Sequence, residues 1–428
     1  MAGLRASLAR LQELRAAFER KLSTAARGGG GAPRPRRPEG SRLREIIGFG
    51  SNPGDLRMFA YAPRQPRPDP ALVVALHGCL QSALIYDHGS GWSELAHQHG
   101  FIVIYPEQQP ANNPKNCFSW FLPGDIARGS GEALSIRQMV DKAVLEFGID
   151  RARIFVTGLS AGGAMASVML ATYPEVFAGG AMIAGLPYGS ASSVQEAFEA
   201  MFNGHRAPSA RALGDRVRAA SDHRGRWPSI SVWHGSADTI VKPSNAAHII
   251  SQWLNVHGMP QRPSAEEQIG PHTRKVWNDE AGQTRIESFT VAGIAHGVPL
   301  ATSGDSCGVP GPFFLDAGLS STHHIARFWG LDRDHPLPRL SVAEVAAESR
   351  TAMLPTLNDV AAAAAKEQDT VRLEIEATVG AHPSLNPNDV IAAAFQAAGL
   401  PAPTPAGSKR IDPGAIIAAA LKAAGLTC

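Results

Sequence analysis

The chain has 428 residues, of which 44% are hydrophobic and 18% are charged, and its 40 Lys and Arg nearly balance its 38 Asp and Glu. This composition excludes collagen-like, fibrous and wholly disordered chains, and it is sufficient for a sizeable buried core. The length corresponds to two or three domains, or to one large α/β domain with appendages. No apolar stretch approaches the roughly 20 residues that cross a bilayer, so we expect no transmembrane segment.

Residues 1–27 have the pattern of a basic amphipathic helix. Apolar residues recur at intervals of three, four and seven, and Arg15 interrupts the stripe that they form. Charged residues spread through the first 22 positions leave no room for the apolar region of a secretory signal peptide. We therefore expect a cytoplasmic location, with an extracellular one as the alternative. The stripe consists of Leu4, Leu8, Leu11, Phe18 and Leu22.

Residues 28–43 are predicted to form a linker, because four consecutive glycines are followed by a segment rich in Pro and Arg. Residues 1–45 contain eleven Lys and Arg and four Glu, so this arm has a surplus of seven positive charges and the rest of the chain a net charge of −5. A solvated arm is the simplest interpretation, and contact with an anionic surface is the alternative.

Residues 44–332 alternate short apolar segments with helical stretches and are predicted to form one domain. Near-continuous apolar runs suit a mostly parallel sheet covered by helices on both faces, so we expect an α/β fold. The candidate strands are Ala71–Leu76, Phe101–Tyr105, Arg153–Thr157, Ala178–Ile183, Ser229–Trp233 and Arg285–Val291.

Residues 333–428 form an Ala-rich tail with an internal repeat. Asp389–Leu400 resembles Ala415–Leu426 at an offset of 26, and each copy follows an Asx-Pro pair. An Asx residue can cap a helix, Pro is tolerated in its first turn, and the Gly near the end of each copy suits its C-terminus. The tail therefore predicts small helices that dock on the body or on a partner, and a weakly ordered tail with helical tendency is the alternative.

Gly158-Leu159-Ser160-Ala161-Gly162 matches G-x-S-x-G. An apolar run precedes it and a helical segment follows it, as in the strand, sharp turn and helix that expose a nucleophilic serine. Ser160 is therefore the candidate nucleophile. The alternative is an ordinary serine in a Gly-rich turn.

A serine nucleophile needs a base and a carboxylate that orients the base. In α/β-hydrolases these partners follow in the order Ser, Asp, His, each after a strand. Asp238 and His296 meet this requirement, since Asp238 follows the Ser229–Trp233 strand and His296 follows the last strand. The competing acids are Asp222, Asp305 and Asp316, and the competing imidazoles, His77 and His234, are expected to be structural.

An oxyanion hole needs two amide donors. One is expected from Ala161, the residue after the nucleophile, and the other from Cys79, in the loop after the strand that ends at Leu76. Trp92, Trp120 and Phe121 border the predicted mouth of the site and are candidates for a substrate pocket, with ordinary packing as the alternative.

Five ordered motifs stand out in the sequence: Leu76–Gln81, Tyr105–Gln108, Asn116–Phe121, Gly158–Gly163 and Trp233–Asp238. Together they resemble the polyhydroxyalkanoate depolymerase family of esterases, which is related to feruloyl and acetylxylan esterases. The resemblance covers roughly residues 46–331 and implies an α/β-hydrolase fold in which Ser160, Asp238 and His296 form the catalytic triad. It also implies a disulfide between Cys79 and Cys117, whereas free thiols are expected in a reducing cytoplasm.

The sequence thus predicts a serine carboxylic-ester hydrolase that acts through an acyl-enzyme. The resemblance favours short-chain polyhydroxyalkanoate (3-hydroxybutyrate) polymer or oligomer esters, with a feruloyl or acetylxylan ester as the alternative. A non-catalytic protein that binds granules or surfaces is the alternative of another class. We expect no cofactor, no metal and no nucleic-acid partner, because zinc-ligand spacing and nucleotide-binding signatures are absent from the sequence. Contact of the terminal appendages with polymer granules or another protein is a further expectation.

Overall fold

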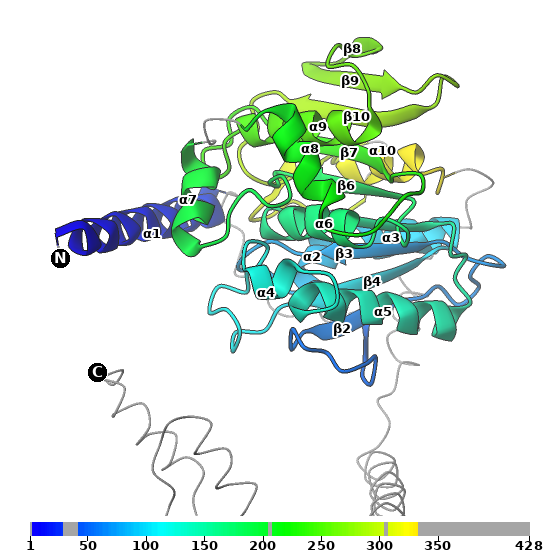
Figure 1. Cartoon of the computed structure of the whole chain (residues 1–428). Helices are drawn as coiled ribbons and strands as arrows, with labels where there is room; N and C mark the ends of the chain where they lie inside the picture. The colour runs from blue at the N-terminus through cyan, green and yellow to red at the C-terminus, as the bar shows by residue number, and fades with distance from the viewer. Residues whose placement is uncertain (1, 29–41, 204–207, 304–306, 333–428) are drawn as a thin grey trace, which may run out of the picture. The chain divides into compact units, whose positions relative to one another are not determined.

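A computed structural model describes residues 2–28, 42–203, 208–303 and 307–332 (Figure 1). The chain divides into two compact units, Met1–Ala352 and Met353–Cys428, and all described residues belong to the first. The predicted tail and its repeat lie outside the described residues, as does most of the predicted linker.

Within the described residues the main sheet has ten strands in the order β1-β2-β4-β3-β5-β6-β7-β10-β9-β8. Its six central strands, β4-β3-β5-β6-β7-β10, are parallel to one another. The strands on either side of them, β1 and β2 at one edge and β9 and β8 at the other, pair antiparallel. The strands are β1 (Arg44–Ile46), β2 (Arg57–Tyr61), β3 (Leu72–Leu76), β4 (Ile102–Glu107), β5 (Ile154–Leu159), β6 (Gly179–Ile183), β7 (Ser229–Gly235), β8 (Ala265–Ile269), β9 (His272–Asn278) and β10 (Thr284–Val291).

The six strands expected from the sequence are the six parallel ones. Every residue of β3, β4, β5 and β6 is buried, so helices must cover both faces of the sheet there. This arrangement confirms the predicted α/β fold. The edge strands were not predicted, because their sequences are mixed or polar; β8, for example, reads Ala-Glu-Glu-Gln-Ile and is almost wholly exposed.

Ten helices are present in the described segments, and none of them is both long and apolar enough to span a bilayer. A separate two-stranded sheet pairs β11 (Val298–Leu300) with β12 (Phe314–Asp316). The helices are α1 (Ala2–Gly28), α2 (Ala83–Ser90), α3 (Trp92–His99), α4 (Pro123–Ile126), α5 (Gly131–Phe147), α6 (Ala161–Thr172), α7 (Val194–Asn203), α8 (Ala210–Arg218), α9 (Ser244–His257) and α10 (Ser321–Phe328).

Helix α6 lies at the centre of the fold. All twelve of its residues are buried, and it contacts β3, β5 and β6 (Figure 1). Its apolar sequence, without a polar face, suits a helix that is enclosed on all sides. The turn from β5 into α6 is thereby held rigidly against the carboxyl ends of the parallel strands, which is where α/β folds place their ligands.

Candidate active site

The turn between β5 and α6 holds Ser160 in a strained backbone conformation. Its φ is 57° and its ψ is −116°, a combination that residues with a Cβ rarely adopt. Glycine is required on both sides, since a Cβ at Gly158 would lie 2.5 Å from the backbone of Gly162, and one at Gly162 would lie 2.3 Å from the carbonyl oxygen of Leu76. The sharp turn brings the Ser160 side chain to the carboxyl end of β5.

Asp238 and His296 are in direct contact in the loops after β7 and β10. The Nδ1 atom of His296 lies 2.7 Å from Oδ2 of Asp238. The backbone amides of Ile240 and Val241 donate to Oδ1 of Asp238 at 2.8 and 2.9 Å. The Nε2 atom of His234 lies 3.3 Å from Oδ2. The carboxylate is therefore fixed from several directions, and it in turn fixes the ring of His296.

Burial and charge act in opposite directions on this carboxylate. Asp238 is 3% exposed, and burial alone would raise the pKa of its carboxyl group. The neighbouring His296 and His234 outweigh that effect and hold the pKa of Asp238 well below its ordinary value. Asp238 is thus ionised at neutral pH, as a group that orients an imidazole must be.

The three predicted residues share one edge of the sheet. Strands β5, β6, β7 and β10 are consecutive and parallel, so Ser160, Asp238 and His296 all follow the carboxyl ends of neighbouring strands. Of the competing acids, Asp222 and Asp316 are exposed, and Asp305 lies outside the described residues.

Two histidines expected to be structural have other partners. The ring of His77 accepts a hydrogen bond at Nε2 from the amide of Gln108, so its Nδ1 donates to the carbonyl of Gly78. Burial lowers the pKa of His77 to about 4, in agreement with a neutral ring. The Nε2 atom of His234, which also lies near Asp238, is 2.9 Å from the carbonyl oxygen of Val241.

The two amides expected to serve an oxyanion lie in the loop after β3, which carries Cys79, and at the start of α6, where Ala161 stands. The amide of Gly78 donates to Oε1 of Gln81 at 2.7 Å, which closes this loop into a tight turn. Neither the amide of Cys79 nor that of Ala161 donates a hydrogen bond to another described residue. Both amides are therefore available to an oxyanion, as such a site requires.

The loop after β3, which carries Cys79, is attached to the segment that follows β4. Cys79 and Cys117, the pair for which the resemblance implied a bridge, are joined by a disulfide. The amide of Leu80 donates to the carbonyl of Lys115 at 2.7 Å. The covalent bond and the hydrogen bond restrain the position of the Cys79 amide.

A buried hydrogen-bonded chain supports the same loop. The backbone amide of Gln108 donates to His77, and its side-chain Nε2 donates to Oε1 of Glu132 at 2.5 Å. The amide of Ser119 donates to Oε2 of Glu132 at 2.8 Å. Burial raises the pKa of Glu132 to about 7. Gln108 and Ser119, which belong to the motifs Tyr105–Gln108 and Asn116–Phe121, thus support the loop after β3.

Ser160 and Ala161 line a pocket of about 570 Å³, within the size range of small-molecule sites. Trp120 and Phe121, the two other candidates for a substrate pocket, line it as well. The other lining residues are Gln12, Arg15, Phe18, Glu19, Cys79, Asn113, Pro114, Lys115, Cys117, Leu186, Val194, Ala197, Phe198 and Met201.

The prediction that Trp92 borders the substrate pocket is wrong. Its side chain is 1% exposed and stacks on Trp329 with ring centroids 5.9 Å apart, and its edge meets Phe101. The residue begins helix α3, and its ring fills the core beneath the sheet rather than the mouth of the site.

The sequence did not predict that helices α1 and α7 line the pocket. Helix α7 contributes Val194, Ala197, Phe198 and Met201, whose spacing of three, four and seven is the signature of one apolar helix face. That spacing predicts an apolar face on α7 but not that this face borders the pocket. The same holds for α1, because an amphipathic pattern does not show where its apolar face packs.

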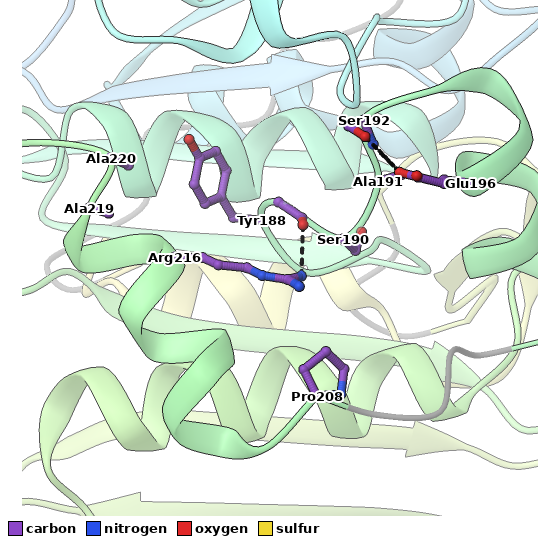
Figure 2. Close-up of a pocket in the computed structure, with 10 residues that line it drawn as sticks. Tyr188, Ser190, Ala191, Ser192, Glu196, Pro208, Arg216, Ala219 and Ala220 are labelled. Carbon is purple, nitrogen blue, oxygen red and sulfur yellow. Dashed lines mark hydrogen bonds between the residues drawn. The ribbon is translucent and has the colours of Figure 1, made fainter.

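A second cavity, of about 640 Å³, is lined by residues 188–192, which precede α7, and by Glu196 of α7. Figure 2 shows Arg216 donating to the carbonyl of Gly189, and Ser192 bonded to Glu196. Tyr188 is the aromatic residue in its lining. Its lining contains none of the predicted catalytic residues.

Comparisons with known proteins agree with this geometry. A family model described as Esterase PHB depolymerase matches residues 62–275. Poly(3-hydroxyalkanoate) depolymerase C of Paucimonas lemoignei is 45% identical over 293 residues, which are 68% of this chain and 70% of that protein. Feruloyl esterase B of Talaromyces stipitatus is 32% identical over 269 residues, 61% of this chain and 74% of that protein. The solved structure of acetyl xylan esterase from Aspergillus awamori matches with a TM-score of 0.59 and 26% identity, over 68% of this chain and 100% of that one.

Proposed function

Because the chain belongs to the Esterase PHB depolymerase family, and is thereby a serine carboxylic-ester hydrolase, we propose that Ser160, His296 and Asp238 are its catalytic triad. We further propose that its substrates are short-chain polyhydroxyalkanoate esters, in particular polymers or oligomers of 3-hydroxybutyrate. The observation that carries the triad is the buried contact of His296 with Asp238, at the same edge of the sheet as the strained serine.

The first step is acylation of Ser160. Since Nδ1 of His296 is engaged by Asp238, Nε2 accepts the proton of the Ser160 hydroxyl as its oxygen attacks the ester carbonyl. The amides of Cys79 and Ala161 donate to the tetrahedral oxyanion. His296 then transfers the proton to the leaving alcohol, and an acyl-serine remains.

The second step repeats the first with water as the nucleophile. His296 removes a proton from water as the water oxygen attacks the acyl carbonyl, and it returns that proton to the oxygen of Ser160 as the acid leaves. Asp238, whose pKa is held low, stays ionised throughout and stabilises the imidazolium of His296.

The substrate proposal depends on the pocket and on the relatives. A mostly apolar pocket of about 570 Å³ suits the short alkyl groups of 3-hydroxybutyrate units. The relative with 45% identity is named as a poly(3-hydroxyalkanoate) depolymerase. An aromatic ester is the second candidate, because Trp120 and Phe121 meet edge to face at 5.2 Å in the lining and present ring surfaces to the pocket.

Initial rates on a 3-hydroxybutyrate trimer, nitrophenyl butyrate and methyl ferulate test the substrate proposal. We expect the two aliphatic acyl esters to have a kcat/KM at least tenfold above that of methyl ferulate, and the Ser160→Ala variant to hydrolyse none of them. If methyl ferulate is the preferred substrate of the wild type, the polyhydroxyalkanoate proposal is wrong, whereas the triad stands.

The disulfide supports an oxidising, extracellular location, because such bonds are rare in reducing compartments. The cytoplasmic location expected from the sequence therefore has no support from the fold. Counting free thiols in protein taken directly from culture medium and from cell extract tests this. The location proposal requires the protein with its Cys79–Cys117 bond intact to be found in the medium.

Polymer contact through the tail is a separate part of the proposal. It depends on the Ala-rich repeat of residues 333–428 alone. Deletion of residues 340–428 is expected to lower binding to polymer granules and to leave hydrolysis of nitrophenyl butyrate unchanged. Equal granule binding by the deleted and full-length chains rules out a role of the tail in this contact.

A further inference from the structure

Helix α1 belongs to the body of the enzyme through one buried face. Leu14, Phe18 and Leu22, spaced four residues apart, are 6%, 9% and 4% exposed, whereas the residues between them are half-buried or exposed. Spacing of this kind places the three side chains on one side of the helix. A solvated arm, as expected from the charge pattern, would leave all three in water.

The surface that receives this face is α7 (Figure 1). The ring of Phe18 lies 5.2 Å from that of Phe198 and 6.4 Å from that of Phe202, and the latter two are stacked at 6.0 Å. Three aromatic rings thus form one cluster between the helices. Pairs at these separations add to the free energy of burial.

A second attachment joins α1 to the loop of the catalytic acid. The ammonium group of Lys21 donates to the carbonyl oxygen of Thr239, the residue after Asp238. The same group lies 4.6 Å from the centre of the Phe202 ring. Helix α1 is therefore held both by α7 and by the segment that carries a member of the proposed triad.

Helix α1 also lines the pocket beside Ser160. Gln12, Arg15, Phe18 and Glu19 border the same cavity as Ser160. Arg15 and Glu19 form an exposed ion pair at 3.7 Å, and Phe18 supplies the apolar surface. Arg15, which interrupts the apolar stripe of the sequence, thus has a place at the border of the site.

We propose that α1 is a wall of the substrate site and that Phe18 on it determines which ester chain lengths are preferred. This proposal builds on the assignment of Ser160 as the nucleophile. A two-carbon acetyl group occupies a small part of a 570 Å³ cavity, whereas a six-carbon chain extends along its walls. The ring of Phe18, together with Phe198 and Met201 of α7, offers apolar contact to the longer chain only.

The test compares Phe18→Ala with Leu22→Ala in the full chain. Leu22 is buried on the same face of α1, one turn further along, but does not line the pocket. Both variants remove apolar contact between α1 and the body, and only Phe18→Ala removes a pocket wall. Circular dichroism and thermal unfolding of both variants verify that they are folded.

Two substrate series are measured by kcat/KM: nitrophenyl acetate against nitrophenyl hexanoate, and methyl butyrate against hexyl butyrate. We expect Phe18→Ala to lower the ratio of kcat/KM for the long member to kcat/KM for the short member by about tenfold in at least one series. Leu22→Ala is expected to change neither ratio more than twofold.

The proposal is overturned if Phe18→Ala leaves both ratios unchanged, if it changes long and short substrates equally, or if Leu22→Ala has the same effect. Labelling with a serine-directed phosphonate separates these results from a failure of the assumed chemistry. If Ser160 is the nucleophile, Phe18→Ala and wild type both carry the label on Ser160. If neither does, it is the nucleophile assignment that has failed, not the role of α1.

Discussion

The Nδ1 atom of His296 lies 2.7 Å from Oδ2 of Asp238, although the two residues are 58 positions apart in the chain. Each residue is only 3% exposed. In this environment the hydrogen bond sets the tautomer and orientation of the imidazole, and it leaves Nε2 as the atom that accepts a proton. The catalytic proposal depends on this pair.

Asp238→Asn tests the pair directly. An amide in this position can present its NH₂ group to Nδ1 and stabilise the tautomer that cannot act as the base, and it does not stabilise the imidazolium. We expect kcat to fall by about 10³ to 10⁴ and KM to change little. The measurement is steady-state hydrolysis of nitrophenyl butyrate by the variant, with Asp222→Asn, an exposed acid outside the pocket, as the control. A loss of less than tenfold in Asp238→Asn would contradict the role of this carboxylate.

Ser160→Ala tests the nucleophile. We expect turnover to fall by at least three orders of magnitude while the midpoint of thermal unfolding stays within a few degrees of wild type, since alanine meets the same backbone strain. Ser167→Ala is the control, because Ser167 is a buried serine of α6 that does not line the pocket, and its hydroxyl donates to the carbonyl of Leu186. Full activity in Ser160→Ala is the outcome that removes the assignment.

Cys117→Ser tests the link between the disulfide and the oxyanion loop. The bond closes a loop of 38 residues, and the chain-entropy relation gives it about 4 kcal/mol of stability. We expect the variant to lose stability on this order and kcat to fall about tenfold with KM little changed, because the Cys79 amide is less well positioned. Urea unfolding and steady-state kinetics measure both quantities.

Cys307→Ser is the matched control for the disulfide. Cys307 is a buried thiol outside the disulfide, and its sulfur lies 3.8 Å from the hydroxyl of Ser320. We expect its replacement to leave kcat unchanged. An unaltered kcat in Cys117→Ser, in protein that has lost stability, would show that the bond stabilises the fold without positioning the donor.

The sequence was most informative where a pattern has one physical solution. Runs that are apolar on both faces suit the parallel core, and the glycines around Ser160 meet backbone atoms from another strand, so no other residue fits there. The prediction for Trp92 failed because its stacking partner, Trp329, follows helix α10 and lies 237 positions further along the chain. The contact of Phe18 with α7 could not be predicted either, since two amphipathic patterns do not show which of their faces meet.

The buried carboxyl of Glu132 predicts a dependence of stability on pH. Burial raises its pKa to about 7 in the folded chain, against an ordinary value of 4.5. The folded state therefore binds more protons than the unfolded state between these values. The contribution of this titration to the free energy of unfolding is complete below pH 4.5. It declines as pH rises to about 7, by about 3 kcal/mol in total.

Glu132→Gln removes this titration. We expect the wild type to lose about 3 kcal/mol of its free energy of unfolding, relative to the variant, as pH rises from 4.5 to 8. Urea unfolding of both proteins at four pH values across this range measures the difference. A difference that is constant with pH would show that Glu132 does not titrate there.

The most direct measurement of the central claim is covalent labelling of the active enzyme with a serine-directed phosphonate, followed by peptide mass spectrometry. We predict one adduct per chain, on the peptide that contains Ser160, with ester hydrolysis lost in proportion to labelling. We also predict that His296→Ala reacts at least a hundredfold more slowly, because the base is missing. An adduct on another residue, or complete hydrolysis in fully labelled protein, would contradict the account.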